Sequence, residues 1–231
     1  MSQKRKSRSK DRRAIFILPN IFTTLSLFAG FYSIVASIQE HFLSAAIAIL
    51  FAAIFDALDG TVARMTGTTS HFGVEYDSLC DLLSFGAAPA ILVYLWALKP
   101  GAVPFTNLMT PDTKTMTLGM VVSFIFLACG ALRLARFNVS AGLRDPGFFQ
   151  GLPIPAGATL ISAAVLWHHR FGIAKAIAPN YIFILFLVLA LAFLMVSNLD
   201  YFSLKHRFIT KNNHPFETLV LIILLPGVLI I

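Results

Sequence analysis

The sequence predicts an all-α integral membrane protein, and three observations carry this prediction. Hydrophobic residues make up 57% of the chain, and charged residues make up only 13%, whereas a soluble domain carries about 45–50% apolar and about 25% charged residues. The apolar residues form long runs, and such runs are expected to be helices because lipid offers no partners to backbone polar groups. The composition is a poor match for a soluble globular enzyme, a disordered chain or a nucleic-acid-binding domain.

Seven apolar runs are candidate spans, several of them only when their polar flanks are counted, because a spanning helix needs about 20 mostly apolar residues. The runs cover residues 21–38, 42–58, 76–98, 117–137, 153–167, 181–198 and 216–231. The longest connections between them contain Pro, Gly and Asn and are expected to be loops. We therefore divide the chain into a basic tail (1–17), a transmembrane catalytic core (18–198), and a cytoplasmic loop with a C-terminal transmembrane helix (199–231). Whether a further helix follows is left open.

The distribution of positive charge predicts the orientation of the spans. Placing the N-terminus in the cytoplasm puts 14 of the 18 Lys and Arg residues on that side and four on the other, which agrees with the positive-inside rule. Seven of them fall within the first thirteen positions, and we interpret this segment as a disordered tail attracted to anionic lipid head groups rather than to nucleic acid. The two cysteines indicate neither a disulfide framework nor a zinc site.

Acidic residues are concentrated at the facing ends of the second and third runs and in the turn between them. Five of the eleven lie between positions 56 and 81: Asp56, Asp59, Glu75, Asp77 and Asp81. The first two aspartates are three residues apart and the last two are four apart, so each pair shares one face of its helix. The glycine-rich turn between them lets the two helices pack as neighbours, and four carboxylates are then expected to converge at the cytoplasmic side.

Such a cluster is costly in a membrane unless a cation holds it together, and ionisable residues in spans usually mark a substrate or ion pathway. Hard oxygen donors suit Mg²⁺, Mn²⁺ or Ca²⁺. Two such ions about 3.5–4 Å apart stabilise displacement at a phosphoryl group. Helix caps solvated by head-group water would explain one or two of these aspartates.

A cation or proton transporter is an alternative from another functional class. Transporter sites, however, lie near the bilayer midplane, at broken helices within repeated halves of the chain.

The spacing of these residues is also familiar. Asp56-x2-Asp59-Gly60-x2-Ala63-Arg64-x8-Gly73-x3-Asp77-x3-Asp81 resembles the signature of the CDP-alcohol phosphotransferase family at every specified position. The resemblance implies a six-helix membrane core, to which the seventh run adds a C-terminal transmembrane helix, and a site open to the cytoplasmic leaflet of the cell membrane. It also implies a homodimer, two divalent cations (Mg²⁺ or Mn²⁺), and transfer of a substituted phosphate from a CDP-linked donor to an alcohol, with release of CMP.

The resemblance also implies a role for each motif residue. Asp56, Asp59 and Asp77 would bind the first metal, and Asp56, Asp77 and Asp81 the second, with Asp81 also taking the proton of the attacking hydroxyl. The remaining assignments concern the CDP-lipid, and they are Gly60, Arg64 and, more weakly, Ser70. Glycine has no Cβ to obstruct a nucleotide, and a guanidinium presents a planar fork to phosphate oxygens. A capping role explains Ser70 equally well.

Three further segments bear on the acceptor alcohol. Residues 18–20 (LPN), 130–138 (GALRLARFN) and 151–157 (GLPIPAG) resemble the phosphatidylserine synthase branch of the family. This resemblance implies CDP-diacylglycerol and L-serine as substrates, in contact with membrane lipids. Arg133 or Arg136 could hold the serine carboxylate, although both could equally be interfacial anchors. The alternative within the family is a glycerol-phosphate or inositol-phosphate acceptor.

Overall fold

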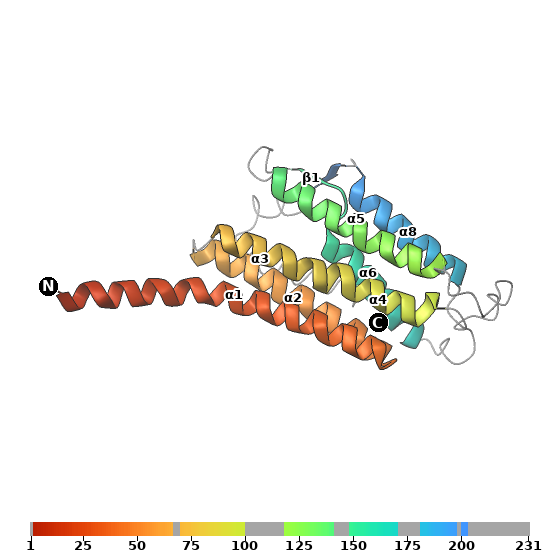
Figure 1. Ribbon diagram of the computed structural model, residues 1–231, viewed down its shortest axis with the longest axis horizontal. Helices are drawn as coiled ribbons and strands as arrows, with labels where there is room; N and C mark the ends of the chain where they lie inside the picture. The colour runs from red at the N-terminus through yellow and green to blue at the C-terminus, as the bar shows by residue number, and fades with distance from the viewer. Residues whose placement is uncertain are drawn as a thin grey trace.

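The computed structural model describes residues 2–66, 70–99, 118–140, 148–170, 181–197 and 200–202, and nearly all of them are helical. The helices, in chain order, are α1 (Ser2–Ile38), α2 (Phe42–Thr66), α3 (His71–Asp81), α4 (Ala88–Val93), α5 (Leu118–Ser140), α6 (Ile154–Arg170) and α8 (Tyr181–Val196). Two π-helical segments, η1 (Leu82–Ala87) and η2 (Tyr94–Leu98), join α3 and α4 into one continuous helix that ends at Leu98. Figure 1 shows α1, α2 and the α3–η2 helix side by side, with α5 and α8 forming the opposite side of the bundle.

The expected all-α membrane architecture is confirmed. Among the described residues, four helical segments are long and apolar enough to cross a membrane, namely Asn20–Ile38, Phe42–Val62, His71–Leu98 and Leu118–Val139. The fifth and sixth expected runs are also helices, α6 and α8, and their crossing of the membrane stays a prediction. The seventh run (216–231) lies outside the described residues.

One expectation about local structure is wrong. The basic N-terminal segment, expected to be disordered, is helical from Ser2 and continues directly into the first span, so that it projects beyond the other helices (Figure 1). Extending an existing helix costs far less than nucleating one, and Lys and Arg are good helix formers.

The structure also contains a short strand pairing. β1 (Phe148–Gln150) pairs antiparallel with β2 (Asp200–Phe202), with Phe149 opposite Tyr201. This short pairing has no period-2 pattern long enough to be recognised in the sequence.

Small residues let α1 pack closely against both α2 and η1. Gly30 faces Ser84 so closely that a Cβ atom on Gly30 would lie 2.5 Å from Ser84 Oγ. The Ser84 hydroxyl donates to the carbonyl of Ser26 at 3.0 Å, and the Ser26 hydroxyl donates to the carbonyl of Ala52 in α2 at 3.1 Å. Close backbone approach at small residues is the usual way in which helices associate in membranes. These contacts place α1 beside both helices that carry the aspartates.

The segment that leads into the N-terminal end of α6 is held by the C-terminal end of α8. Gly151 adopts a positive φ of 76°, a conformation that favours glycine, and a Cβ atom there would collide with the carbonyl of Met195. The next residue, Leu152, donates its backbone N–H to the carbonyl of Leu194 at 2.9 Å. This close approach explains why the segment before α6 requires glycine at position 151.

Candidate active site

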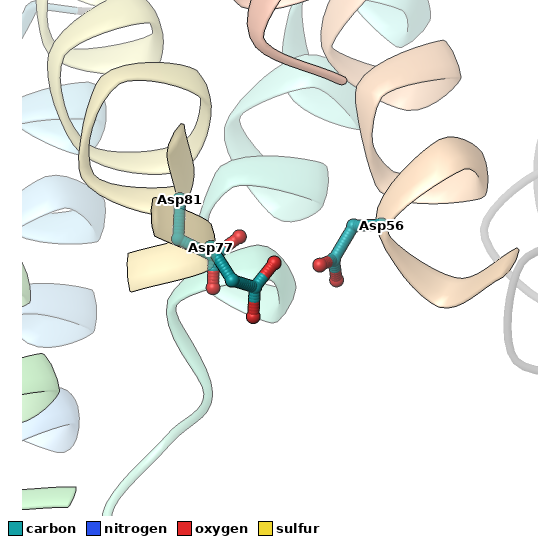
Figure 2. A group of neighbouring side chains, drawn as sticks. All are labelled: Asp56, Asp77 and Asp81. Carbon is teal, nitrogen blue, oxygen red and sulfur yellow. The ribbon is translucent and has the colours of Figure 1, made fainter. Parts of the chain in front are cut away.

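Three of the four predicted aspartates converge between α2 and α3. Asp56 lies on α2, and Asp77 and Asp81 lie one turn apart on α3. One carboxylate oxygen of each lies within 4.8 Å of the other two. Figure 2 shows the Asp56 carboxylate pointing from one helix towards the carboxylates of the other two residues. The paired helical spacing read from the sequence is therefore confirmed in space for this group, which we call the carboxylate cluster.

Asp59 is placed differently. It follows Asp56 by one turn on α2, but its oxygens are not part of the carboxylate cluster. The residue is buried, and its Oδ2 accepts a hydrogen bond from the Thr23 hydroxyl of α1. Within the described part of the chain, Asp59 Oδ1 is buried without a hydrogen-bond partner. Three of the four carboxylates expected to converge thus lie within 4.8 Å of one another, and Asp59 lies beside them, where it interacts electrostatically with Asp56 and Asp77.

The cluster has the chemistry of a divalent-cation site. Three carboxylates this close repel one another, and a buried charge without a partner is strongly unfavourable. Oxygen donors are the ligands that Mg²⁺, Mn²⁺ and Ca²⁺ prefer. The orphaned Oδ1 of Asp59 adds a buried acceptor that a cation would satisfy. The residues present therefore fit a metal centre of the kind predicted from the sequence.

The structure separates the two arginines that were predicted to share one role. The guanidinium of Arg133 interacts electrostatically with the carboxylate of Asp81, and its Cζ atom lies 5.7 Å from the centre of the Phe137 ring. Arg133 Nε is buried without a hydrogen-bond partner within the described residues. Arg136 instead donates from Nη1 to the carbonyl of Val196 at the end of α8, at 3.3 Å. Of the two, Arg133 is the one beside the carboxylate cluster.

The residues assigned to the CDP-lipid lie around the turn between α2 and α3. Gly60 is exposed, and a Cβ atom built on it would find no atom within 4 Å, so the space beside it is open. Ser70 is the N-cap of α3, where its Oγ accepts a hydrogen bond from Gly73 N at 3.0 Å. The capping interpretation of Ser70 is thereby confirmed. Arg64 lies on the last turns of α2, and its side chain is outside the described part of the structure.

Sequence reasoning missed the polar residues that support the aspartates. Thr23 contacts Asp59, and the neighbouring Thr24 Oγ1 lies 3.1 Å from the Tyr76 hydroxyl, next to Asp77. Both threonines belong to an apolar run and were not singled out in the sequence. The available signal was their place one turn after Asn20, near the start of that run. No pattern within the run indicated which helix they would face.

Comparisons with known proteins place the chain among related sequences. The family model of CDP-alcohol phosphatidyltransferase matches residues 16–196. A CDP-diacylglycerol–serine O-phosphatidyltransferase of Helicobacter pylori is 38% identical over 210 residues, which cover 91% of this chain and 81% of the relative. An archaetidylserine synthase of Methanothermobacter thermautotrophicus is 37% identical over 194 residues, 83% of this chain and 72% of the relative. A CDP-diacylglycerol–serine O-phosphatidyltransferase of Methanocaldococcus jannaschii is 36% identical over 178 residues, 77% and 73% respectively.

Proposed function

Because the chain belongs to the CDP-alcohol phosphatidyltransferase family, we propose that it transfers the phosphatidyl group of CDP-diacylglycerol to the hydroxyl of L-serine, giving phosphatidylserine and CMP. The observation that carries this proposal is the carboxylate cluster of Asp56, Asp77 and Asp81, with Arg133 beside it. The names of the similar proteins support serine as the acceptor. An anionic cluster next to a cationic side chain suits a reaction that brings a pyrophosphate and an amino acid together.

Asp56, Asp59 and Asp77 would hold one divalent cation, and Asp56, Asp77 and Asp81 a second, either Mg²⁺ or Mn²⁺. When bound, such ions neutralise the pyrophosphate and the charge that develops on the departing phosphate. Asp56 and Asp77 would belong to both ligand sets. Their positions within 4.8 Å of each other and of Asp81 support this assignment.

Asp81 is the proposed general base. The serine oxygen forms a bond to the phosphorus that carries diacylglycerol, while the bond from that phosphorus to the CMP oxygen breaks. Asp81 accepts the hydroxyl proton as the new bond forms, and CMP leaves without a covalent enzyme intermediate. Arg133, which interacts electrostatically with Asp81, would hold the serine carboxylate near that base.

The nucleotide is assigned to the turn between the two aspartate helices. The open space around Gly60 would admit the CDP group, and Arg64 would contact its phosphates. We assign Ser70 only a supporting role, since its hydroxyl is engaged as the cap of α3. Arg136 is the weaker candidate for the serine carboxylate because it bonds to the end of α8.

The chain would be a multi-pass protein of the cytoplasmic membrane, with its N-terminus and active site on the cytoplasmic side. The excess of Lys and Arg on that side supports this orientation. The division into a tail (1–17), a catalytic core (18–198) and a C-terminal part (199–231), as well as a homodimeric state, belong to the same proposal. Labelling of single cysteines introduced at either end of α5 in sealed vesicles tests the orientation.

The proposed reaction is tested by measuring CMP release from CDP-diacylglycerol by the purified protein. L-serine, glycerol phosphate and inositol phosphate are compared as acceptors, each with Mg²⁺, with Mn²⁺ and with excess chelator. We expect serine-dependent, metal-dependent CMP release that is absent in Asp56→Ala. Equal or faster release with another acceptor would reassign the substrate within the family. Cation flux in liposomes without CDP-lipid, combined with no CMP release, would favour a transporter instead.

A further inference from the structure

Helix α1 lies outside the aspartate motif, yet it contacts the motif directly through Thr23. This threonine is 3% exposed and donates its hydroxyl hydrogen to Oδ2 of Asp59, a residue 36 positions later. Asp59 is itself only 7% exposed. A hydrogen bond from a buried hydroxyl to a carboxylate of another helix stabilises that carboxylate and fixes its orientation.

The contact leaves the two oxygens of Asp59 in different states. Oδ2 receives the Thr23 hydrogen bond, whereas Oδ1 is buried with no hydrogen-bond partner in the described part of the chain. A buried, unsatisfied carboxylate oxygen costs free energy that a protein normally avoids. Since Asp59 follows Asp56 by one helical turn, a cation bound at the carboxylate cluster is the simplest partner for Asp59 Oδ1.

We propose that Thr23 is a positioning residue that holds the Asp59 carboxylate so that Oδ1 remains available to one of two divalent cations. The inference rests on the metal centre proposed above and adds a residue outside the motif to it. Hydrogen bonds from outside a metal's own ligands orient those ligands and raise the affinity for the ion. Because Thr23 reaches the metal centre through Asp59, its loss is expected to weaken the single cation that Asp59 binds and to leave the other unchanged.

The surrounding contacts make this role specific to Thr23. Thr24, the next residue, donates to the carbonyl of Asn20 at 2.6 Å and contacts Tyr76 of α3. Thr61, two positions after Asp59, donates to the carbonyl of Ala57 in its own helix at 2.8 Å. Thr61→Val is therefore a matched control, because it removes the same hydroxyl close to the site without removing a bond to an aspartate.

The test measures Mn²⁺ binding to the purified protein without substrate, by the electron paramagnetic resonance signal of free Mn²⁺. We expect two Mn²⁺ ions per wild-type chain. Thr23→Val is expected to weaken one of them by about 10-fold or more, the usual effect of losing such a supporting contact, while Thr23→Ser and Thr61→Val bind as wild type. In an Asp59→Ala background, Thr23→Val is expected to have no further effect, because both changes act through one carboxylate.

Each outcome separates this inference from the metal centre itself. If the wild-type protein binds no Mn²⁺, or if Asp56→Ala binds Mn²⁺ as tightly as the wild type does, both the metal centre and the inference are overturned. Wild-type binding that is unchanged in Thr23→Val would overturn the inference alone. Equal losses in Thr23→Ser and Thr23→Val would also overturn it, because the serine variant keeps the hydroxyl. Melting temperatures recorded without metal identify any variant that lowers affinity only by unfolding.

Discussion

The side-chain amide of Asn138 in α5 donates a hydrogen bond to Ser78 Oγ in α3 at 2.9 Å. Ser78 follows Asp77 directly, and its own hydroxyl hydrogen goes to the carbonyl of Val74 at 3.0 Å. The bond therefore joins the C-terminal end of α5, which carries Arg133, to the helix that carries two cluster aspartates. Residues from distant parts of the sequence are held in register around the candidate site by this contact.

Removing the hydrogen bond between Asn138 and Ser78 is expected to destabilise the protein slightly, and the effects of changing either residue are expected to be coupled. Asn138→Ala and Ser78→Ala should each lower the free energy of unfolding, and their coupling energy should be about 0.5–1.5 kcal/mol, the net value of a typical hydrogen bond. Thermal unfolding of the two single variants and the double variant in one detergent measures this coupling. Strictly additive effects would show that the bond contributes nothing to stability.

Asp81→Asn is expected to leave the fold and most nucleotide binding in place but to remove the proposed base. The rate of CMP release should fall by at least about 10²-fold, the lower end for general acid–base catalysis. Binding of CDP-diacylglycerol, followed by protection from thermal unfolding, provides the control. Turnover close to wild type in a folded Asp81→Asn protein would exclude Asp81 as the base.

Gly60→Ala is expected to lose activity without losing stability. A methyl group at this position meets no atom within 4 Å, and alanine favours the helix over glycine by about 0.5–1 kcal/mol. The same group would obstruct a nucleotide that approaches the backbone, so the KM for CDP-diacylglycerol should rise. Kinetics at saturating serine, together with the melting temperature, check both expectations.

Gly30→Ala, unlike Gly60→Ala, is expected to lower the stability of the protein. Its added Cβ would lie 2.5 Å from Ser84 Oγ and 2.7 Å from Ser84 Cα, and such overpacking typically costs about 1–3 kcal/mol. We expect a lower melting temperature for Gly30→Ala and a higher or equal one for Gly60→Ala. Equal melting temperatures for the two variants would contradict the packing of α1 against η1.

Arg133→Lys and Arg136→Lys are expected to differ, although the sequence treats the two positions alike. Lysine keeps the charge but loses the planar fork that binds a carboxylate at two points. Arg133→Lys should raise the KM for serine by roughly 10- to 100-fold, which corresponds to the free energy of one hydrogen bond to a charged group. The KM for CDP-diacylglycerol should change little. Arg136→Lys should leave the serine KM nearly unchanged, since Arg136 bonds to the Val196 carbonyl.

Serine dependence measured at saturating CDP-lipid and metal decides this comparison. A wild-type serine KM in both variants would place the carboxylate pocket elsewhere. A larger rise in Arg136→Lys than in Arg133→Lys would contradict the separation of the two guanidinium groups seen in the structure.

The sequence by itself determined the membrane architecture and the three carboxylates of the carboxylate cluster. Long apolar runs leave a helix as the natural way to satisfy the backbone in lipid, and helices occur at all six expected positions that the structure describes. The spacing of Asp56, Asp77 and Asp81 within their helices placed each side chain on the correct face, because helical periodicity is a local property. Their convergence followed as soon as two neighbouring helices packed together.

Only the tertiary structure decided what each side chain meets across a helix interface. Arg133 and Arg136 lie one turn apart on α5, yet one interacts electrostatically with Asp81 and the other bonds to the end of α8. Asp59 shares a turn with Asp56, but Thr23 of α1 binds it, and Ser70 is engaged as a helix cap. Sequence spacing defines directions around a single helix axis, whereas these contacts depend on how neighbouring helices cross, which is set by close packing at small residues such as Gly30 and Ser84.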